Sequence, residues 1–278
     1  MLFRSGSAIT GSGLFNVNGG TLAVGTGATV HGQNVTLASG GIAGAGTLVV
    51  DGTFGWTGGT QSGTGLTQVS NTGTLSIGGG SAKTLSQRTF VNQATVGTWT
   101  GTGAIDLNNA GVFTNAGTLV GGTNASAILS VGGTWTNNGT FTPNSGAVRF
   151  TGASAVIAEG TGTENFGLIT LNAAATTLTI NAAAVTASTI TFGAATGNGQ
   201  LTFNGTTLTV SGTTTLTAPS TAGITNTMTI ASGTFQTGAL AINGGAGTRT
   251  STLSIGAATV TVTGNFTSTG SVAGNQKV

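Results

Sequence analysis

The sequence is poor in almost every residue type from which chemical sites are built. Among 278 residues it has no cysteine, one histidine and four acidic residues. The lack of cysteine excludes disulfides and thiolate metal ligands. Charged residues make up 4% of the chain, whereas an ordinary globular domain has about 25%. Functions that depend on clustered charge are therefore disfavoured.

Positive charge is too sparse for a nucleic-acid interface. The six basic residues are scattered along the chain: Arg4, Lys83, Arg88, Arg149, Arg249 and Lys277. Nucleic-acid binding relies on clustered Lys and Arg that displace several phosphate counterions. We therefore expect no nucleic-acid partner.

Long apolar runs and prolines are also missing. No run approaches the ~18 apolar residues of a membrane-spanning helix, so no membrane insertion is expected. The opening segment MLFRSGSAITGSG has no apolar core of a secretory signal, and the strand pattern still runs near the last residues. We expect the chain to be a fragment of a longer one. With only two prolines, a collagen-like helix is excluded.

What the sequence does contain is glycine, threonine and β-branched apolar residues. Glycine occurs 52 times in the 278 residues. A disordered chain is normally rich in charge and poor in β-branched residues, which is the reverse of this composition. Threonine, valine and isoleucine are enriched in strands, and glycine and asparagine in tight turns. The composition therefore predicts an all-β protein with many short strands.

Repeats indicate how those strands are arranged. Trp56, Trp99 and Trp135 are each followed by threonine and lie 43 and 36 residues apart. Such intervals fit two turns of about 20 residues each, which is a solenoid period. We expect the three tryptophans to lie in the interior stack or to cap its wider part, because most tryptophans are largely buried.

The second half of the chain repeats four-residue strands in two interleaved series. The first series starts at Thr177, Thr207, Thr227 and Thr252, and the second at Thr189, Thr214, Ala239 and Thr259. Both have a mean period of about 24 residues. Strict alternation predicts that Leu178 and Ile180 point inward while Thr177 and Thr179 face solvent. Asparagines at 108–109, 137–138 and 204 are expected at corners.

These patterns predict an all-β fold: a single-domain, right-handed parallel β-helix, or β-solenoid, with roughly 20–25 residues per coil. The handedness follows from the general rule for parallel crossovers. Residues 1–278 would form one continuous solenoid of about a dozen coils, with more aromatic coils over about 1–150 and Thr/Ala-rich coils over about 151–278.

The repeats resemble those of a known group of proteins. The segments GTLVVDGTFGWTGGTQSGTG, KTLSQRTFVNQATVGTWTGTG and GTWTNNGTFTPNSGAVRFTG are similar to repeats of bacterial secreted and cell-surface, adhesin-like β-solenoids, which include haemagglutinin-type and autotransporter-passenger repeats. The resemblance covers most of the chain, and it implies an extracellular stalk that presents or constitutes an adhesive surface. It brings no fixed functional residues with it.

The supply of catalytic groups is too thin for an obvious active site. The carboxylates are Asp51, Asp106, Glu159 and Glu164, and His31 is the one histidine. Glycoside cleavage usually needs two carboxylates about 5 to 10 Å apart, and a Ser-His-Asp triad would have to use His31. We interpret the carboxylates as solvated turn residues and His31 as a surface residue. The Gly-x-Gly turns lack the context of a nucleotide site, so we expect no enzyme activity, cofactor or metal.

The sequence thus predicts the structural rod of a bacterial extracellular, adhesin-like surface protein, with association between copies end to end or laterally. Two alternatives stay open. One is a module that recognises a surface such as ice or a glycan through outward Thr-x-Thr arrays, for which the candidate residues are Thr177, Thr179, Thr207, Thr209, Thr227 and Thr229. The other is a polysaccharide-degrading β-helix enzyme.

Overall fold

The structure is a computed structural model of the chain. It describes residues 1–4, 7–121, 128–143, 147–150, 154–158, 161–162, 164–171, 176–193, 196–269 and 276–277. Over these residues the fold is all-β without helix, and parallel sheets stack as a β-solenoid of about 11 turns. The predicted fold class is confirmed. Candidate residue Glu159 lies outside the described residues.

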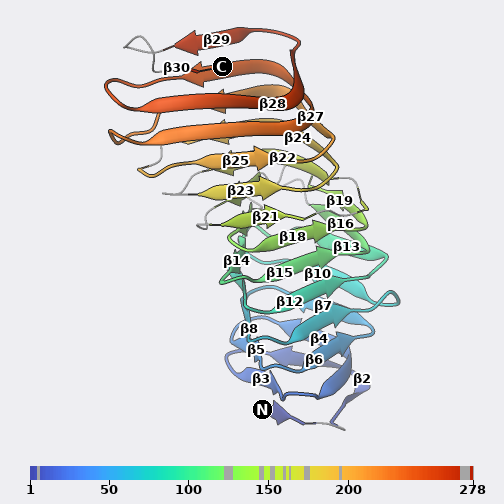
Figure 1. Cartoon of the computed structure of the whole chain (residues 1–278). Helices are drawn as coiled ribbons and strands as arrows, with labels where there is room; N and C mark the ends of the chain where they lie inside the picture. Colours follow the sequence, from blue (N-terminus) through green and yellow to red (C-terminus); the bar gives the residue numbers. More distant parts are fainter. Residues whose placement is uncertain are drawn as a thin grey trace. The chain divides into compact units, whose positions relative to one another are not determined.

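The chain divides into two compact units, and each is described by itself. Unit 1 comprises Met1–Gly146 with Thr161–Thr163, and unit 2 comprises Ala147–Gly160 with Glu164–Val278. Figure 1 shows the strands of each unit stacked as successive rungs.

Unit 1 contains strands β1 to β19. They are β1 Leu2–Phe3, β2 Ile9–Val17, β3 Thr21–Val24, β4 Thr29–Leu37, β5 Gly41–Ala43, β6 Thr47–Val50, β7 Thr53–Trp56, β8 Gly59–Ser62, β9 Leu66–Val69, β10 Thr74–Ile77, β11 Lys83–Ser86, β12 Thr89–Asn92, β13 Val96–Trp99, β14 Ile105–Asn108, β15 Val112–Asn115, β16 Thr118–Gly121, β17 Ile128–Val131, β18 Thr134–Asn137 and β19 Thr140–Thr142.

Unit 2 contains strands β20 to β30. They are β20 Ala147–Phe150, β21 Ala155–Ile157, β22 Glu164–Leu171, β23 Thr177–Ile180, β24 Ala184–Phe192, β25 Gln200–Phe203, β26 Thr207–Leu216, β27 Thr225–Asn243, β28 Thr250–Val262, β29 Phe266–Thr269 and β30 Gln276–Lys277. The long strands β24, β26, β27 and β28 each run through a corner of the coil, because different segments of the same strand pair in different ladders.

Three parallel sheets build most of unit 1: β1 to β4 pair with the strand two places further along the chain, β4 also pairs with β7, and later strands pair with the strand three places further along. From β6 onward the first sheet contains β6, β9, β12, β15 and β18, the second contains β7, β10, β13, β16 and β19, and the third contains β8, β11, β14 and β17. Every coil therefore satisfies its backbone through its neighbours on either side.

Coil length varies more than the sequence period suggested. Thr29 pairs with Thr47 in a short coil of unit 1, whereas Gln200 pairs with Thr227 in a distinctly longer coil of unit 2. The extra residues are taken up at the corners and at register shifts in the ladders of β2, β24 and β26. Gly44 is one corner where glycine is required: its φ is +98°, and a Cβ there would lie 2.1 Å from the carbonyl oxygen of Val24.

The interior of unit 1 is a stack of apolar and aromatic side chains in register. Phe90, Phe113 and Trp135 follow one another in the first sheet, with ring centroids 5.0 and 5.1 Å apart. Trp56 and Trp99 lie in the second sheet with Ile77 between them, and the exposed fraction of each tryptophan is at most 2%. The prediction that the three tryptophans are interior is confirmed.

A buried asparagine ladder continues the first sheet beside the aromatic stack. Asn92, Asn115 and Asn137 are register partners with no exposed surface. Nδ2 of Asn115 donates to Oδ1 of Asn137 at 2.8 Å and to the Thr140 carbonyl at 2.9 Å. The pair Asn137–Asn138 lies at a corner as expected, because Asn137 ends strand β18 and a bend follows it. The side chain of Asn137 nevertheless points inward, because the neighbouring rungs supply the amide partners that a core position needs.

Two basic side chains are also interior. Lys83 and Arg88 are fully buried in unit 1. Lys83 points inward because it is the register partner of Gly59 on one side and Ile105 on the other, and its Nζ donates to the Ser81 carbonyl at 2.9 Å. Burial lowers the pKa of Lys83. Sparse charge in this chain does not mean that every charge is on the surface.

Arg88 connects three successive coils at one corner. Its guanidinium makes five hydrogen bonds, to Oγ1 of Thr67 and to the carbonyls of Gly44, Gly46, Ser62 and Leu66. None of these partners is a carboxylate, so the charge is solvated by backbone dipoles rather than neutralised. Burial lowers the pKa of Arg88 to about 10, yet the group stays protonated at neutral pH.

Candidate functional site

The most regular surface feature is a set of outward hydroxyl side chains on one sheet of unit 2. We call it the hydroxyl face; its residues are Thr177, Thr179, Gln200, Thr202, Thr227, Thr229, Thr252 and Ser254. They lie on β23, β25 and the first segments of β27 and β28, which Figure 1 shows as adjacent rungs. The face has two columns and four rungs, and seven of the eight positions carry a hydroxyl.

The inward positions between these residues hold the face in place. Leu178 and Ile180 have no exposed surface, as predicted, and they are the register partners of Leu201 and Phe203. Because side chains alternate along a strand, the buried column forces Thr177 and Thr179 outward. Rungs of a parallel sheet are about 4.8 Å apart, and alternate residues along a strand are about 6.6 Å apart.

The six candidate threonines do not form one array. Thr177, Thr179, Thr227 and Thr229 belong to the hydroxyl face, but Thr207 and Thr209 lie on β26 in a different sheet. The proposed series in which Thr207 follows Thr177 was therefore wrong. The second series has the same fault, because Thr259 pairs with Thr234 and not with the segment that contains Ala239. Strands of the same composition occur in each of the three sheets, so their spacing in the sequence does not show which sheet a given strand joins.

The other two faces of unit 2 are less uniform. The face that contains Thr207 and Thr209 has Ala184 and Gln236 among its rungs, and Oγ1 of Thr186 donates to Oδ1 of Asn165. The remaining face has its rungs at Arg149, Thr170, Thr191, Thr215, Ala241 and Thr267. Both interrupt their columns of hydroxyl side chains, whereas the hydroxyl face does so only at Gln200 over its four rungs; the preceding rung of the same sheet carries Val156 beside Thr179.

The hydroxyls of the hydroxyl face are available to an external partner. Among the described residues, none of its seven hydroxyl side chains makes a hydrogen bond to another protein group. The face carries no charge over its four rungs, and Lys277 follows Thr252 as the next register partner. Each hydroxyl can donate one hydrogen bond and accept two.

A second candidate site lies in unit 1, where His31 meets Asp51. Nδ1 of His31 is 2.8 Å from Oδ2 of Asp51, in the next coil, and both side chains are partly exposed. His31 also lines a pocket of about 280 Å³ whose other walls are Ala8, Ile9, Gly11, Gly32 and Gln33. Asp51, which we interpreted as a solvated turn residue, is thus also paired with His31.

An irregularity in strand β2 accounts for the pocket. Ile9 pairs with Gly32 and Leu14 pairs with Asn34, so residues 10–13 face the single residue Gln33. Gly11 within this segment has a φ of +100°. A bulge of this kind bends the chain away from its partner strand, which leaves the space beside His31.

The remaining carboxylates do not assemble with this pair. Asp51 follows β6 in the first sheet of unit 1, and Asp106 lies on β14 in the third. The interpretation of Glu164 as a solvated turn residue was wrong, because it is a buried residue at the start of β22 with 1% of its surface exposed. Its position pairs with Val185, an inward position of the next coil. Among the described residues no group of three or more His, Cys, Asp or Glu could hold a metal ion.

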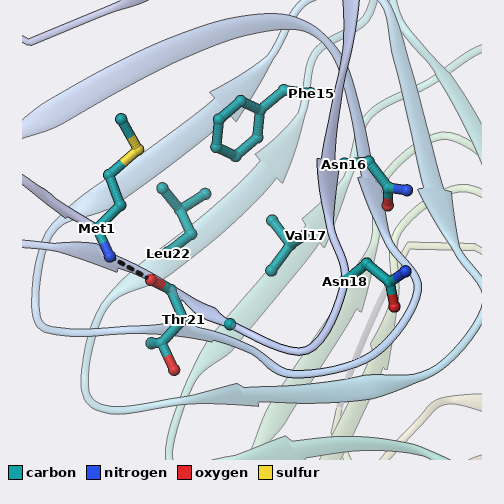
Figure 2. A pocket seen from close by; sticks show the side chains of 8 residues that line it. Met1, Phe15, Asn16, Val17, Asn18, Thr21 and Leu22 are labelled. Atoms are coloured by element: carbon teal, nitrogen blue, oxygen red, sulfur yellow. Dashed lines mark hydrogen bonds between the residues drawn. The ribbon is translucent and has the colours of Figure 1, made fainter.

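A second pocket lies at the N-terminal coils of unit 1 (Figure 2). It has a volume of about 210 Å³ and is lined by Met1, Phe15, Asn16, Val17, Asn18, Gly20, Thr21 and Leu22. The terminal amine of Met1 donates to the Thr21 carbonyl at 2.8 Å. Met1 and Leu14 are largely exposed. Because none of these lining side chains is titratable, the pocket offers no side-chain acid–base chemistry.

Sequence reasoning missed the asparagine ladder, the buried cations and the His31–Asp51 pair. A signal existed for the ladder, since Asn92, Asn115 and Asn137 recur at intervals of 23 and 22 residues, each two positions after an aromatic residue. The pair also had a signal, because His31 and Asp51 are 20 residues apart, close to one coil. For Lys83 and Arg88 the sequence offers none that we recognise.

Comparison with known proteins identifies no relative of this chain. No protein-family model, no curated protein and no solved structure matches this chain. In the part of the chain that the structure describes, no helix has the length and apolarity needed to span a bilayer.

Proposed function

We propose that the chain is a segment of the structural rod of a bacterial extracellular, adhesin-like surface protein, and that it acts by presentation and adhesion rather than by catalysis. The observation that supports this most is the way the coils stack. In each unit, successive coils pair through three parallel sheets. A fold in which every repeat contacts only its neighbours extends without limit on its length.

The interior supports the same proposal. Its polar groups serve to join coils: the asparagine ladder bonds rung to rung, and Arg88 bonds to the carbonyls of two preceding coils. These groups are buried, so they meet no substrate. They suit a molecule whose task is to hold its shape.

The location is tested on cells that produce this chain. Antibody raised against the purified protein should label intact cells, and external protease should remove the label without lysis. A cytoplasmic protein released at the same time as the label would indicate leakage and serves as the control. Labelling that occurs only after the cells are lysed would refute the proposed location.

The non-enzymatic part of the proposal has its own test. A panel of polysaccharides is incubated with the protein, and new reducing ends or unsaturated products are measured. We expect none. Turnover that disappears in His31→Ala or Asp51→Asn, while both variants stay folded, would establish the enzymatic alternative at the pair described above.

Association between copies, end to end or laterally, belongs to the same proposal. Exposed apolar side chains occur at Met1, Leu2, Leu14 and Phe266, with exposed fractions of 49% or more. Sedimentation velocity over a hundredfold range of concentration should show growth in size. A single monomeric species throughout would count against it.

A second candidate function is recognition of an external surface, and the hydroxyl face favours it. Its columns are in register over four rungs, and its hydroxyls have no protein partner in the described part. A rod that only spans distance needs polar strands, but it does not need one uniform face.

A further inference from the structure

We propose that the hydroxyl face binds ice, with Thr179, Thr202, Thr229 and Ser254 as its uninterrupted column of hydroxyls. This inference rests on the second candidate function, surface recognition, and is independent of the rod. The face is a regular two-dimensional array of neutral hydroxyls, with rungs about 4.8 Å apart and columns about 6.6 Å apart.

The chemistry of the face disfavours three other kinds of occupant. A protein partner would need apolar or aromatic anchors, since binding energy at protein interfaces concentrates in residues such as Trp, Tyr and Arg. The hydroxyl face carries none of these, and all three tryptophans of the chain are buried in unit 1. An ionic surface or a charged polymer would need opposite charges, and the face has none over its four rungs.

A glycan is disfavoured by the same composition. Sugar sites are concave and combine an apolar wall with a few fixed polar groups. The hydroxyl face belongs to the outer side of a sheet, and neither of the two pockets described above is lined by its residues. What remains is a partner that hydrogen-bonds to many neutral hydroxyls at a regular repeat, and ordered water in ice meets that requirement.

The methyl groups of threonine contribute as well. Threonine is β-branched, so its χ1 angle is restricted in a strand and its hydroxyl and methyl groups hold fixed directions. On each rung one buried residue lies between the two outward residues. These buried residues pair with one another in register and so hold the four rungs in register; they are Leu178, Leu201, Met228 and Leu253. The array is therefore ordered before it meets its ligand, which lowers the entropic cost of binding.

The area sets the expected strength. Four rungs cover about 14 Å along the coil axis, so we expect weak adsorption that is visible as inhibition of ice recrystallisation. The protein is compared with Thr202→Lys/Thr229→Lys, which places two charges on adjacent rungs of the hydroxyl face. The matched control is Thr207→Lys/Thr234→Lys, which places two charges on adjacent rungs of another face of unit 2.

We expect inhibition by the parent protein and by the control, and at least a tenfold higher concentration for the same effect with the hydroxyl-face variant. If the lysine variant does not fold, Thr202→Val/Thr229→Val keeps the shape and removes the hydroxyls, and a loss of inhibition is expected there too. No inhibition by the parent protein, or equal loss in both lysine variants, would overturn the proposal. Retention of the parent on chitin or cellulose that the hydroxyl-face variant abolishes, without any effect on ice, would overturn it in favour of a glycan. Neither result bears on the rod, which the cell-labelling experiment tests separately.

Discussion

Nδ2 of Asn92 donates a hydrogen bond of 2.7 Å to Oδ1 of Asn115, its register partner one coil later. The same nitrogen also donates to the carbonyl of Thr118 at 3.0 Å. One buried side chain thus bonds both to the next rung and to the backbone at the start of strand β16. Such a network fixes the register of the coils more specifically than apolar contacts do, because each member is satisfied only by the correct neighbour.

Asn115→Ala should therefore lower the free energy of unfolding by about 2 kcal/mol or more, since it removes three hydrogen bonds: the one from Asn92 and those to Oδ1 of Asn137 and to the Thr140 carbonyl. Urea denaturation followed by circular dichroism measures the loss. Asn108→Ala, at an exposed residue one strand earlier, is the control and should stay within about 0.5 kcal/mol of the parent. Equal effects at both positions would contradict the role given to the ladder.

Arg88→Met should be strongly destabilising, by about 3 kcal/mol or more, because it removes five hydrogen bonds and leaves four buried or partly buried carbonyls facing an apolar side chain. Arg149→Met removes an exposed cation and serves as the comparison. Chemical denaturation of the two variants gives the difference, and a variant Arg88→Met as stable as Arg149→Met would show that the guanidinium is dispensable.

Lys83→Met should have the opposite sign. The ammonium has one described acceptor and no carboxylate, so an apolar side chain of similar length should raise the free energy of unfolding by about 1 kcal/mol. Because burial lowers the pKa of Lys83 in the folded state below 10.5, the folded protein loses this proton before the unfolded chain does. The cost of burying the charge is fully present below the folded-state pKa and fades as the pH rises toward 10.5.

The advantage of Lys83→Met over the parent should accordingly be largest at neutral pH and shrink in alkaline solution. Stability measured from neutral pH up to pH 10.5 for both proteins tests this, with Arg149→Met again as the exposed-cation control. An advantage that grows with pH would show that the buried ammonium stabilises the fold instead of weakening it.

Gln61→Leu should stabilise unit 1 by about 1 kcal/mol or more, because a buried polar group without partners costs free energy that leucine does not. Gln61 is fully buried between Ile42 and Leu85 of the neighbouring rungs, and among the described residues neither atom of its amide has a hydrogen-bond partner. Gln68→Leu, at an outward position where Nε2 bonds to Gln93, is the control and should give no gain. Thermal unfolding of both variants measures the effect, and a destabilised Gln61→Leu would reveal a partner for the amide.

Removal of the His31–Asp51 pair should change stability little. Both side chains are partly exposed, with 59% and 31% of their surface accessible, and pairs of this kind contribute about 0.2–1 kcal/mol. Asp51→Asn should show no more than that small loss. Since the chain has one histidine, its NMR signals report the pair without ambiguity, and an unchanged histidine spectrum in Asp51→Asn would argue against the contact.

The fold was largely predictable because its signal is local and repeated. Alternation within a strand fixes which side chains point inward, and it placed Leu178 and Ile180 correctly, as burial preference placed the three tryptophans. The number of coils followed from the mean period, with about 11 found against about a dozen expected.

The candidate site was predictable only in part, for a physical reason. A coil has three sheets, and strands such as TLTI at Thr177 and TLTV at Thr207 satisfy any of them equally well. Which sheet a strand joins depends on the lengths of the corners, and these differ from coil to coil. Burial of Glu164, Lys83 and Arg88 was missed because it depends on carbonyls and neighbours from other coils, which no short stretch of sequence contains.

The bonds of Arg88 also set an order of assembly. Its acceptors at Gly44 and Gly46 precede it by 44 and 42 residues, and those at Ser62 and Leu66 by 26 and 22. A nascent chain that has reached Arg88 can therefore complete all the bonds of the guanidinium only when two earlier coils are already wound. This region should thus behave as one kinetic nucleus of three coils, from which winding proceeds toward the C-terminus, rather than as repeats that form one at a time.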